Sequence, residues 1–151
     1  MKGFYNVTDK LKDTLLAEPF VNTVTFGSID DVDLNKQTIF PLSHITVNNT
    51  TVGSKTLTFN ISILSMDIVD ISKDEVTDIF VGNDNEQDVL NTQLGVLDRL
   101  MSLLQRGDLY SDKYQVEADV TCEPFTDRFE NKLAGWVATF DVQIQNDMTV
   151  C

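Results

Sequence analysis

The sequence predicts an α+β fold, in which a mixed, mainly antiparallel β-sheet carries two main helices in the order α-β-β-β-α-β-β. Residues 56–70 and 134–145 alternate apolar and polar side chains, which is the two-residue period of a strand. Residues 85–106 repeat apolar side chains at steps of three and four, which is the period of a helix. A length of 151 residues fits one compact unit, so we expect a single domain over residues 1–151.

The N-terminal part predicts a helix followed by a strand. The helix shows apolar residues at steps of three and four, and Pro19 ends it; these residues are Phe4, Val7, Leu11 and Leu15. Residues 21–28 contain β-branched and aromatic side chains and predict a strand that ends at Gly27. Residues 30–37 predict a polar loop.

Residues 39–70 predict one long β-hairpin. Pro41 places residues 39–47 at an edge or at the start of a strand, and the Asn and Gly residues of 48–55 predict a turn. The second strand has an apolar face for the core, formed by Leu57, Phe59, Ile61 and Ile63. Its other face carries Thr58, Asn60 and Ser62, which are polar but uncharged in an otherwise acidic chain. We expect this face to meet protein, either another layer of the same domain or a neighbouring subunit.

The second helix is the most strongly marked element. Asn83 and Glu86 match a capping box, and Gly107 follows Arg106 as a stop signal. Its apolar stripe predicts either core packing on the sheet, which we favour, or a seam between subunits; the stripe is Leu90, Leu94, Leu97, Met101 and Leu104.

Two further strands are predicted at residues 115–123 and 134–145. In the first, Glu117, Asp119 and Glu123 alternate with apolar residues and share one face. Such a row of carboxylates predicts an acidic stripe that faces solvent or the lumen of an assembly rather than a catalytic pair.

Composition and motifs argue against catalysis and against gripping nucleic acid. The net charge of −13 opposes binding to a phosphate backbone, which depends on Lys and Arg. His44 is the only histidine, no nucleophile motif accompanies it, and its place in a strand predicts a structural role. Residues 31–42 resemble a calcium loop, but Lys36 and Leu42 occupy the positions that need Gly and Glu. We therefore expect no enzyme activity, no cofactor and no metal.

Cys122 and Cys151 predict free thiols in a reducing compartment. The N-terminal residues lack the apolar core of a signal peptide, and no apolar run has the length of a membrane span. We expect a protein that does not enter the membrane.

The order of elements resembles a known family. The relevant segments are an N-terminal helix leading into PFVNTVTFGS, the long hairpin, the helix NEQDVLNTQLGVLDRLMSLLQRG and the final strand GWVATFDVQIQ. Together they resemble the small tail-terminator and tail-completion proteins at the neck of tailed bacteriophages, especially those of crAss-like and marine Bacteroidetes phages. The resemblance covers nearly the whole chain and carries no catalytic motif.

The resemblance implies a structural virion protein that is made in the bacterial cytoplasm and forms a ring of identical subunits. The ring, of six or possibly twelve copies, would end tail-tube polymerisation and join the tail to the connector or portal protein. DNA would pass through the lumen without specific binding. Two alternatives stay open: a dodecameric head–tail connector ring, and a soluble module that binds a small molecule or carbohydrate on the polar strand face.

Overall fold

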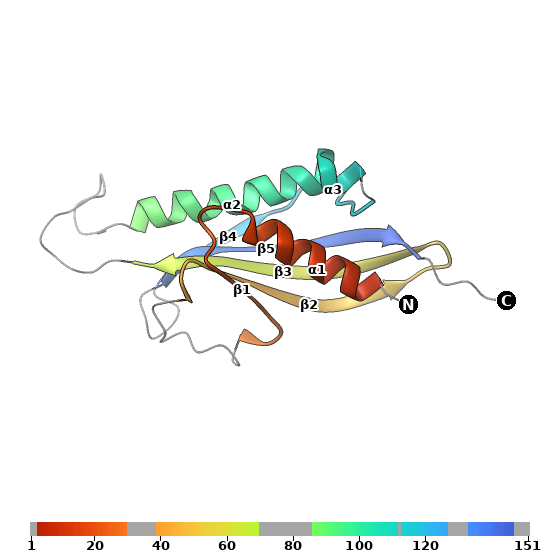
Figure 1. Cartoon of the computed structure of the whole chain (residues 1–151), viewed down its shortest axis with the longest axis horizontal. Coiled ribbons are helices and arrows are strands. Elements are labelled where there is room, and N and C mark those ends of the chain that lie inside the picture. Colours follow the sequence, from red (N-terminus) through yellow and green to blue (C-terminus); the bar gives the residue numbers. More distant parts are fainter. Residues whose placement is uncertain (1–2, 30–38, 70–85, 112, 127–132, 147–151) are drawn as a thin grey trace, which may run out of the picture.

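The elements of the chain follow the predicted order, with one short helix added. The structure is a computed structural model, and it describes residues 3–29, 39–69, 86–111, 113–126 and 133–146. Figure 1 shows the elements, which are α1 (Gly3–Leu16), β1 (Thr23–Phe26), β2 (Leu42–Val52), β3 (Thr56–Ile68), α2 (Glu86–Arg106), α3 (Asp108–Ser111), β4 (Cys122–Thr126) and β5 (Leu133–Gln145). The short helix α3 was not predicted.

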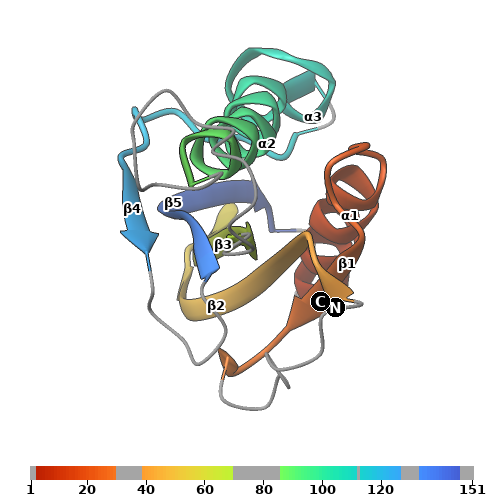
Figure 2. The same ribbon diagram turned by 90° about the vertical axis from the view of Figure 1, so that its left-hand side faces the viewer.

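The strands form one sheet in the order β1-β2-β3-β5-β4. The β1–β2 pair is parallel and the other three pairs are antiparallel. Helices α1 and α2 lie side by side on the same face of the sheet, which we call the helix face (Figures 1 and 2). The predicted α+β class, the mainly antiparallel sheet and the long hairpin are therefore confirmed.

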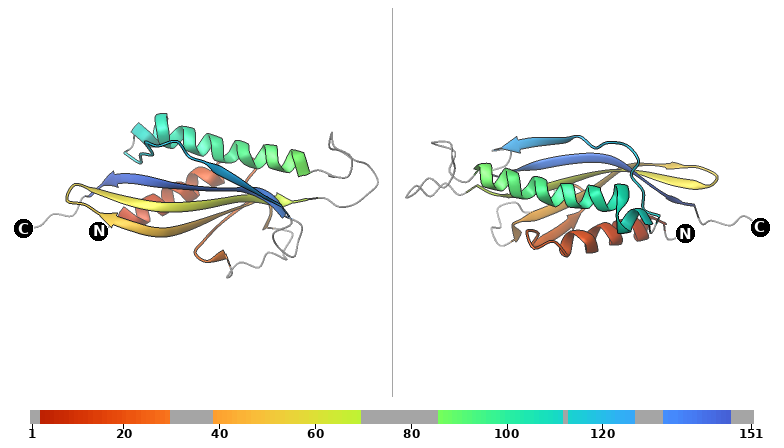
Figure 3. Two further views of the ribbon diagram at one scale, coloured as in Figure 1. Left: turned by 180° about the vertical axis from the view of Figure 1, so that it is seen from behind. Right: turned by 90° about the horizontal axis from the view of Figure 1, so that it is seen from above.

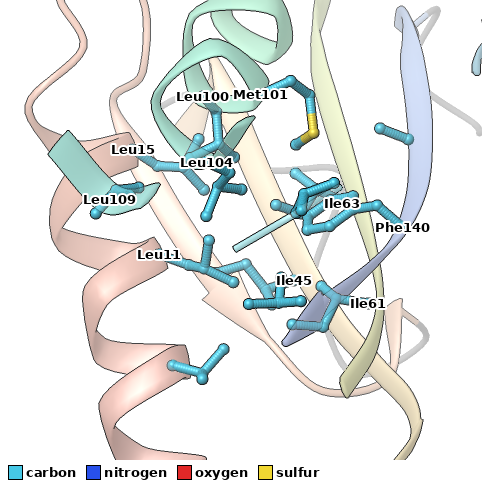
Figure 4. Packing of buried hydrophobic residues seen from close by; sticks show 14 of the residues in the cluster. Leu11, Leu15, Ile45, Ile61, Ile63, Leu100, Met101, Leu104, Leu109 and Phe140 are labelled. Atoms are coloured by element: carbon cyan, nitrogen blue, oxygen red, sulfur yellow. The ribbon is translucent and has the colours of Figure 1, made fainter. Parts of the chain in front are cut away.

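The main core lies between the helix face and the two long helices. Strands β3 and β5 pair without interruption from Thr56↔Gln145 to Ile68↔Leu133, so their apolar side chains form matching rows. Leu11 and Leu15 of α1 and Leu104 of α2 belong to the same cluster, and Figure 4 shows them gathered with Ile45 of β2 between the helices and the sheet. Burial of such large aliphatic side chains contributes about 1.5–3 kcal/mol each, so this layer dominates the stability of the fold.

A second, smaller apolar cluster lies on the opposite face of the sheet, at the end near the start of β2. It consists of Phe40, Leu42, Met66, Phe125 and Leu133, with Leu64 and Val137 partly buried against it. These residues belong to the same chain, so this half of the second face is already covered from within the molecule.

Two predicted strand boundaries and one residue of the predicted apolar stripe on the second helix are wrong. Residues 48–52 continue β2 as a strand, because their ladder with β3 extends to Val52↔Leu57 and only residues 53–55 form the turn. Residues 116–121 are not part of a strand; between residues 115 and 126, only Gln115, through an isolated bridge to Gln143, and β4 pair with β5. On α2, Leu94 is 37% exposed, while the polar Gln93 is buried. The predicted loop at 30–37 and the predicted capping residue Asn83 lie outside the described residues.

Segment 116–121 leaves the sheet because α2 holds it. The backbone N–H of Val116 donates to the carbonyl of Leu104 at 3.1 Å, and Gln105 Nε2 donates to the carbonyl of Ala118 at 3.0 Å. These bonds replace the strand ladder that the alternating pattern would otherwise form with β5. The alternation of apolar and polar residues in this segment therefore reflects packing beneath α2 rather than a strand. Val116, for example, is buried although it lies outside any strand.

Gly135 fixes how closely β5 can approach β3. A Cβ atom at this position would lie 2.0 Å from the carbonyl oxygen of Ser65 and 2.8 Å from Cα of Met66. Both are backbone atoms of β3, so relief requires the two strands to move apart. Phe125 of β4 pairs with Gly135 and belongs to the second apolar cluster, which a shift of β5 would disturb as well.

We expect Gly135→Ala to lower the free energy of unfolding by about 3 kcal/mol or more, because overpacking against backbone cannot relax by side-chain rotation. Gly95→Ala is the matched control: a Cβ there meets only the flexible Arg99 side chain at 3.4 Å, and alanine favours helix by about 1 kcal/mol. Urea unfolding followed by circular dichroism measures both variants. Equal stability of the two variants would contradict the close approach of β3 and β5.

Candidate interaction surface on the open face of the sheet

The candidate residues Thr58, Asn60 and Ser62 lie on the face of β3 that points away from the helices. They alternate with the buried residues Leu57, Phe59 and Ile61, and each is half-buried. None of the described helices or strands covers them (Figure 3). With their neighbours Asn48, Thr139 and Asp141 they form a surface that we call the polar face.

Side chains of the polar face are hydrogen-bonded to one another across three strands. Asn48 Nδ2 donates to Asn60 Oδ1 and lies within 2.9 Å of Ser62 Oγ as well. Asn60 Nδ2 donates to Asp141 Oδ1 at 2.9 Å, and Ser62 Oγ shares a 2.9 Å hydrogen bond with Thr139 Oγ1. The hydrogen bonds run in rows from β2 through β3 to β5, so the face is preorganised and its polar groups are largely satisfied before any partner arrives.

A β-bulge brings Asn48 into this network. The register of β2 against β3 shifts between Val47 and Asn49, which leaves Asn48 as an extra residue. Such a residue is freed from the ladder, and its side chain can be redirected. Asn48 therefore turns to the same side as Asn60 and Ser62. The sequence showed Asn48 only as a turn residue, whereas the alternation in 134–145 already placed Thr139 and Asp141 on the polar side of their strand.

Two members of the predicted acidic stripe adjoin the polar face. Glu117 and Asp119 are exposed, and together with Thr58, Asn60 and Asp141 they line a cleft of about 350 Å³. The cleft opens where segment 116–121 departs from β5. The structure thus brings together two groups of candidate residues that the sequence placed on different strands.

Glu123 takes a different position from the other two carboxylates. It lies in β4, pairs with Val137 and is exposed, but it does not line the cleft. The prediction that Glu117, Asp119 and Glu123 share one face of a single strand is therefore wrong, because only Glu123 belongs to a strand. The carboxylates form a pair at the cleft and a separate exposed residue on β4.

His44 is fully buried between β1 and β2, and both ring nitrogens are hydrogen-bonded. Nδ1 lies 2.7 Å from Thr25 Oγ1, and Nε2 lies 2.8 Å from the carbonyl oxygen of Gly27. A neutral ring with the proton on Nε2 satisfies both contacts, since it donates to the carbonyl and accepts from the hydroxyl. Burial lowers the pKa of His44 from 6.5, against the raising effect of the Gly27 carbonyl. This geometry agrees with the structural role predicted for His44.

Cys122 is a free thiol beside a second hollow, which also touches Asp98, Asp119 and Trp136. Burial and the nearby carboxylate of Asp98 both raise the pKa of this thiol. Because the thiolate is the reactive form, this environment disfavours nucleophilic chemistry at Cys122. Cys151 lies outside the described residues.

Among the described residues no group of three or more His, Cys, Asp or Glu side chains is arranged to hold a metal ion. No helix in the described part of the chain is long and apolar enough to span a membrane. The groups present at the polar face and cleft are hydroxyls, amides and carboxylates, which suit hydrogen bonding and repulsion of anions.

No model of a protein family matches the sequence, and no curated protein matches it.

We expect the ring of His44 to titrate below pH 6.5 in the folded protein, because burial disfavours the imidazolium. Since the unfolded chain then binds the proton more readily, this group leaves stability unchanged above about pH 6.5 and lowers it as the pH falls toward the folded pKa. His44 is the only histidine, so its ring signals in a two-dimensional NMR spectrum report the titration without ambiguity. The same chain unfolded in urea is the control, and a folded midpoint at or above that of the unfolded chain would disprove the expectation.

Proposed function

We propose that this protein is a structural virion subunit that assembles into a homo-oligomeric ring at the head–tail junction of a tailed bacteriophage. In this role the ring ends tail-tube polymerisation and joins the tube to the connector, with DNA passing through its lumen. The observation that carries the proposal is the polar face, a preorganised surface of Asn, Ser and Thr side chains that no described element covers. The resemblance of the element order to tail-terminator proteins supplies the specific role.

The chemistry of the polar face favours contact with protein. Hydroxyl and amide groups that already bond one another need little new pairing when water is removed, whereas a charged surface would require each ion to be desolvated. The face includes one carboxylate, that of Asp141, and this group accepts a hydrogen bond from Asn60. In a chain with 24 acidic residues, such a weakly charged surface is suited to a neighbouring subunit that carries the same excess of negative charge.

The cleft carboxylates support a passage for DNA. Glu117 and Asp119 are exposed beside the polar face, so a contact through that face places them at the border between two subunits. Carboxylates repel the phosphate backbone, and the overall charge of −13 acts in the same direction. A wall of this kind lets a polyanion slide without adhering. The proposed copy number is six, with a dodecameric connector ring as the variant.

The cleft of about 350 Å³ favours one other candidate, a soluble module that binds a small polar ligand. Hydroxyl, amide and carboxylate groups from Thr58, Asn60 and Asp141 converge on it. Its lining offers polar contacts on several sides, but the stacking of a sugar ring needs an aromatic face presented to the ligand. The ring and the module differ in oligomeric state, which the next experiment measures.

We expect Ser62→Lys to disrupt assembly, because a long cationic side chain at the centre of the polar face must be desolvated when a neighbour packs on it. Ser62 bonds both Asn48 and Thr139, so it occupies the middle of the network. The concentration needed for half-assembly should rise by roughly tenfold or more, which corresponds to about 1.4 kcal/mol per contact. Light scattering coupled to size-exclusion chromatography measures the assembled mass.

Asn91→Lys is the control for this substitution, because it adds the same charge to an exposed position on α2 away from the polar face. The ring proposal requires Asn91→Lys to assemble like the original protein. A strict monomer at all concentrations would contradict self-assembly in solution, and electron microscopy in the presence of tail tubes would then test whether the tube induces the ring. If no ring forms on the tube either, the proposal fails.

We expect Glu117→Lys combined with Asp119→Lys to make the assembled protein bind duplex DNA, since two repelling groups become attractive at each subunit border. Asp9→Lys combined with Asp88→Lys changes the net charge equally at exposed positions on α1 and α2. Fluorescence anisotropy at several salt concentrations compares the two double variants. If both bind DNA equally well, the cleft does not line the lumen.

A further inference from the structure

Strand β2 has a long free edge that its neighbour β1 does not cover. The parallel pairing with β1 involves only Leu42 to Ile45, and β2 continues to Val52. The chain turns away after Phe26, at Gly27 with its positive φ of 107°, so β1 cannot extend along β2. Residues 48–52 are exposed, and within the described part of the chain no strand pairs with them on the side of β1.

The backbone groups of Thr50 and Val52 point outward from this edge. The N–H of Gly53 donates to the carbonyl of Thr56 across the hairpin, and hydrogen-bonded pairs alternate along an antiparallel ladder. Residues Asn49 and Thr51 therefore bond to β3, which leaves the N–H and C=O groups of Thr50 and Val52 directed away from the sheet. These are the groups that an additional strand would use.

The two edges of the sheet differ in how they are protected. Free edges are normally guarded against pairing by charges, prolines, β-bulges or very short strands. The opposite edge follows this rule, because β4 is five residues long, contains the exposed Glu123, and has Pro124 at a position whose nitrogen faces outward. The β2 edge from Thr46 to Val52 reads TVNNTTV, with neither a charge nor a proline, and the bulge at Asn48 is the one guarding feature within it.

An apolar projection and an apolar groove lie along the same edge. Val52 is 72% exposed and pairs with Leu57, so its side chain is on the helix face. Phe4, Phe26 and Val47 line a groove of about 590 Å³ on that face, and the rings of Phe4 and Phe26 are in edge-to-face contact at 5.9 Å. Phe26 is 52% exposed, which leaves apolar surface open to a neighbour.

We propose that two copies of this chain pair antiparallel through their β2 edges, about a two-fold axis at Thr50. With Thr50 opposite Thr50 of the second copy, the outward groups of both residues form a hydrogen-bonded pair. Val52 then lies opposite Asn48, the extra residue of the bulge in the other copy, while its side chain is on the helix face, the same face as Val47 of that copy. Each Val52 therefore enters the groove of Phe4, Phe26 and Val47 of its partner, and the contact is reciprocal, as a two-fold interface requires.

The charge distribution favours a second copy as the occupant. Each chain carries a net charge of −13, so contact between two copies is least opposed where both surfaces are uncharged. Neither Thr46–Val52 nor the groove residues carry a charge, and the hairpin turn that follows the strand contains the exposed, cationic Lys55. The projection on β2 and the groove, which α1, β1 and β2 line together, lie along the same edge of the sheet, so one edge supplies both halves of a self-complementary contact.

This pairing is independent of the ring proposed above. It uses the strand edge and the helix face, whereas the ring contact uses the polar face. A two-fold contact closes on itself and cannot build a ring, so the paired form is a separate state in which the edge is hidden from other strands.

The test uses charge at the two-fold axis. In Thr50→Lys, two ammonium groups would face one another, and in Thr50→Glu two carboxylates would do so; like charges directly opposite destabilise a strand pair. Each variant should weaken the dimer by roughly tenfold or more. A mixture of the two variants should restore a dimer that contains one copy of each, as native mass spectrometry resolves by mass. Thr51→Lys, whose side chain lies on the other face, is the control and should dimerise normally.

Each outcome decides the proposal. Sedimentation velocity supports the proposal if the original protein and Thr51→Lys are dimers, if each Thr50 variant alone loses the dimer, and if the mixture of the two Thr50 variants regains it. A monomer at every concentration overturns it, as does a dimer that Thr50→Lys leaves intact. Pairing of the edge with a different protein while the chain alone stays monomeric also overturns it. Because Ser62→Lys leaves the β2 edge unchanged, its effect on ring formation is read separately from these results.

Discussion

The continuous pairing of β3 with β5 is the constraint on which the rest of the structure depends. It runs the full length of both strands and sets one register for thirteen residues of each. Because side chains alternate, that single register decides at once which rows meet the helices and which rows form the polar face. Gly135 allows the two backbones to approach closely at one end, and no other residue type fits there. A slip by one residue would place Asn60 and Ser62 in the core.

The unequal lengths of the strands explain where surfaces for contact arise. The outer strands β1 and β4 are short, whereas β2, β3 and β5 are long, so each outer strand leaves part of its neighbour unpaired. On the β5 side, segment 116–121 is held by α2 and opens the cleft beside Asp141. On the β2 side, the gap leaves an uncharged strand edge. Both features follow from the same asymmetry of the sheet.

The sequence was sufficient to predict elements whose side chains pack in the usual way. The periods of 134–145 and 85–106 gave β5 and α2 nearly to the residue, since burial on one side of a sheet or helix imposes them. Residues 48–52 were misread because Asn favours turns, yet here Asn48 gains hydrogen bonds across the sheet to Asn60 and Ser62. Within the candidate site, the sequence alone indicated Thr58, Asn60 and Ser62, because these residues are polar but uncharged in an otherwise acidic chain. The sequence could not predict that these residues lie next to Glu117 and Asp119, because this proximity depends on tertiary contacts that no local pattern encodes.

The distribution of charge fits the two proposed contacts to different symmetries: the ring contact through the polar face and the two-fold contact through the β2 edge. The polar face combines self-bonded amides and hydroxyls with carboxylates at one border, and in the proposed ring it would meet a different surface of the next subunit, as a head-to-tail contact requires. The β2 edge is uncharged along its length and carries both projection and groove, so it matches a copy of itself. A chain with a large negative charge associates with itself only through surfaces that lack charged groups or whose charged groups point away from the contact. These two surfaces meet that condition in different ways, one by internal hydrogen bonding and the other by the lack of ionisable side chains.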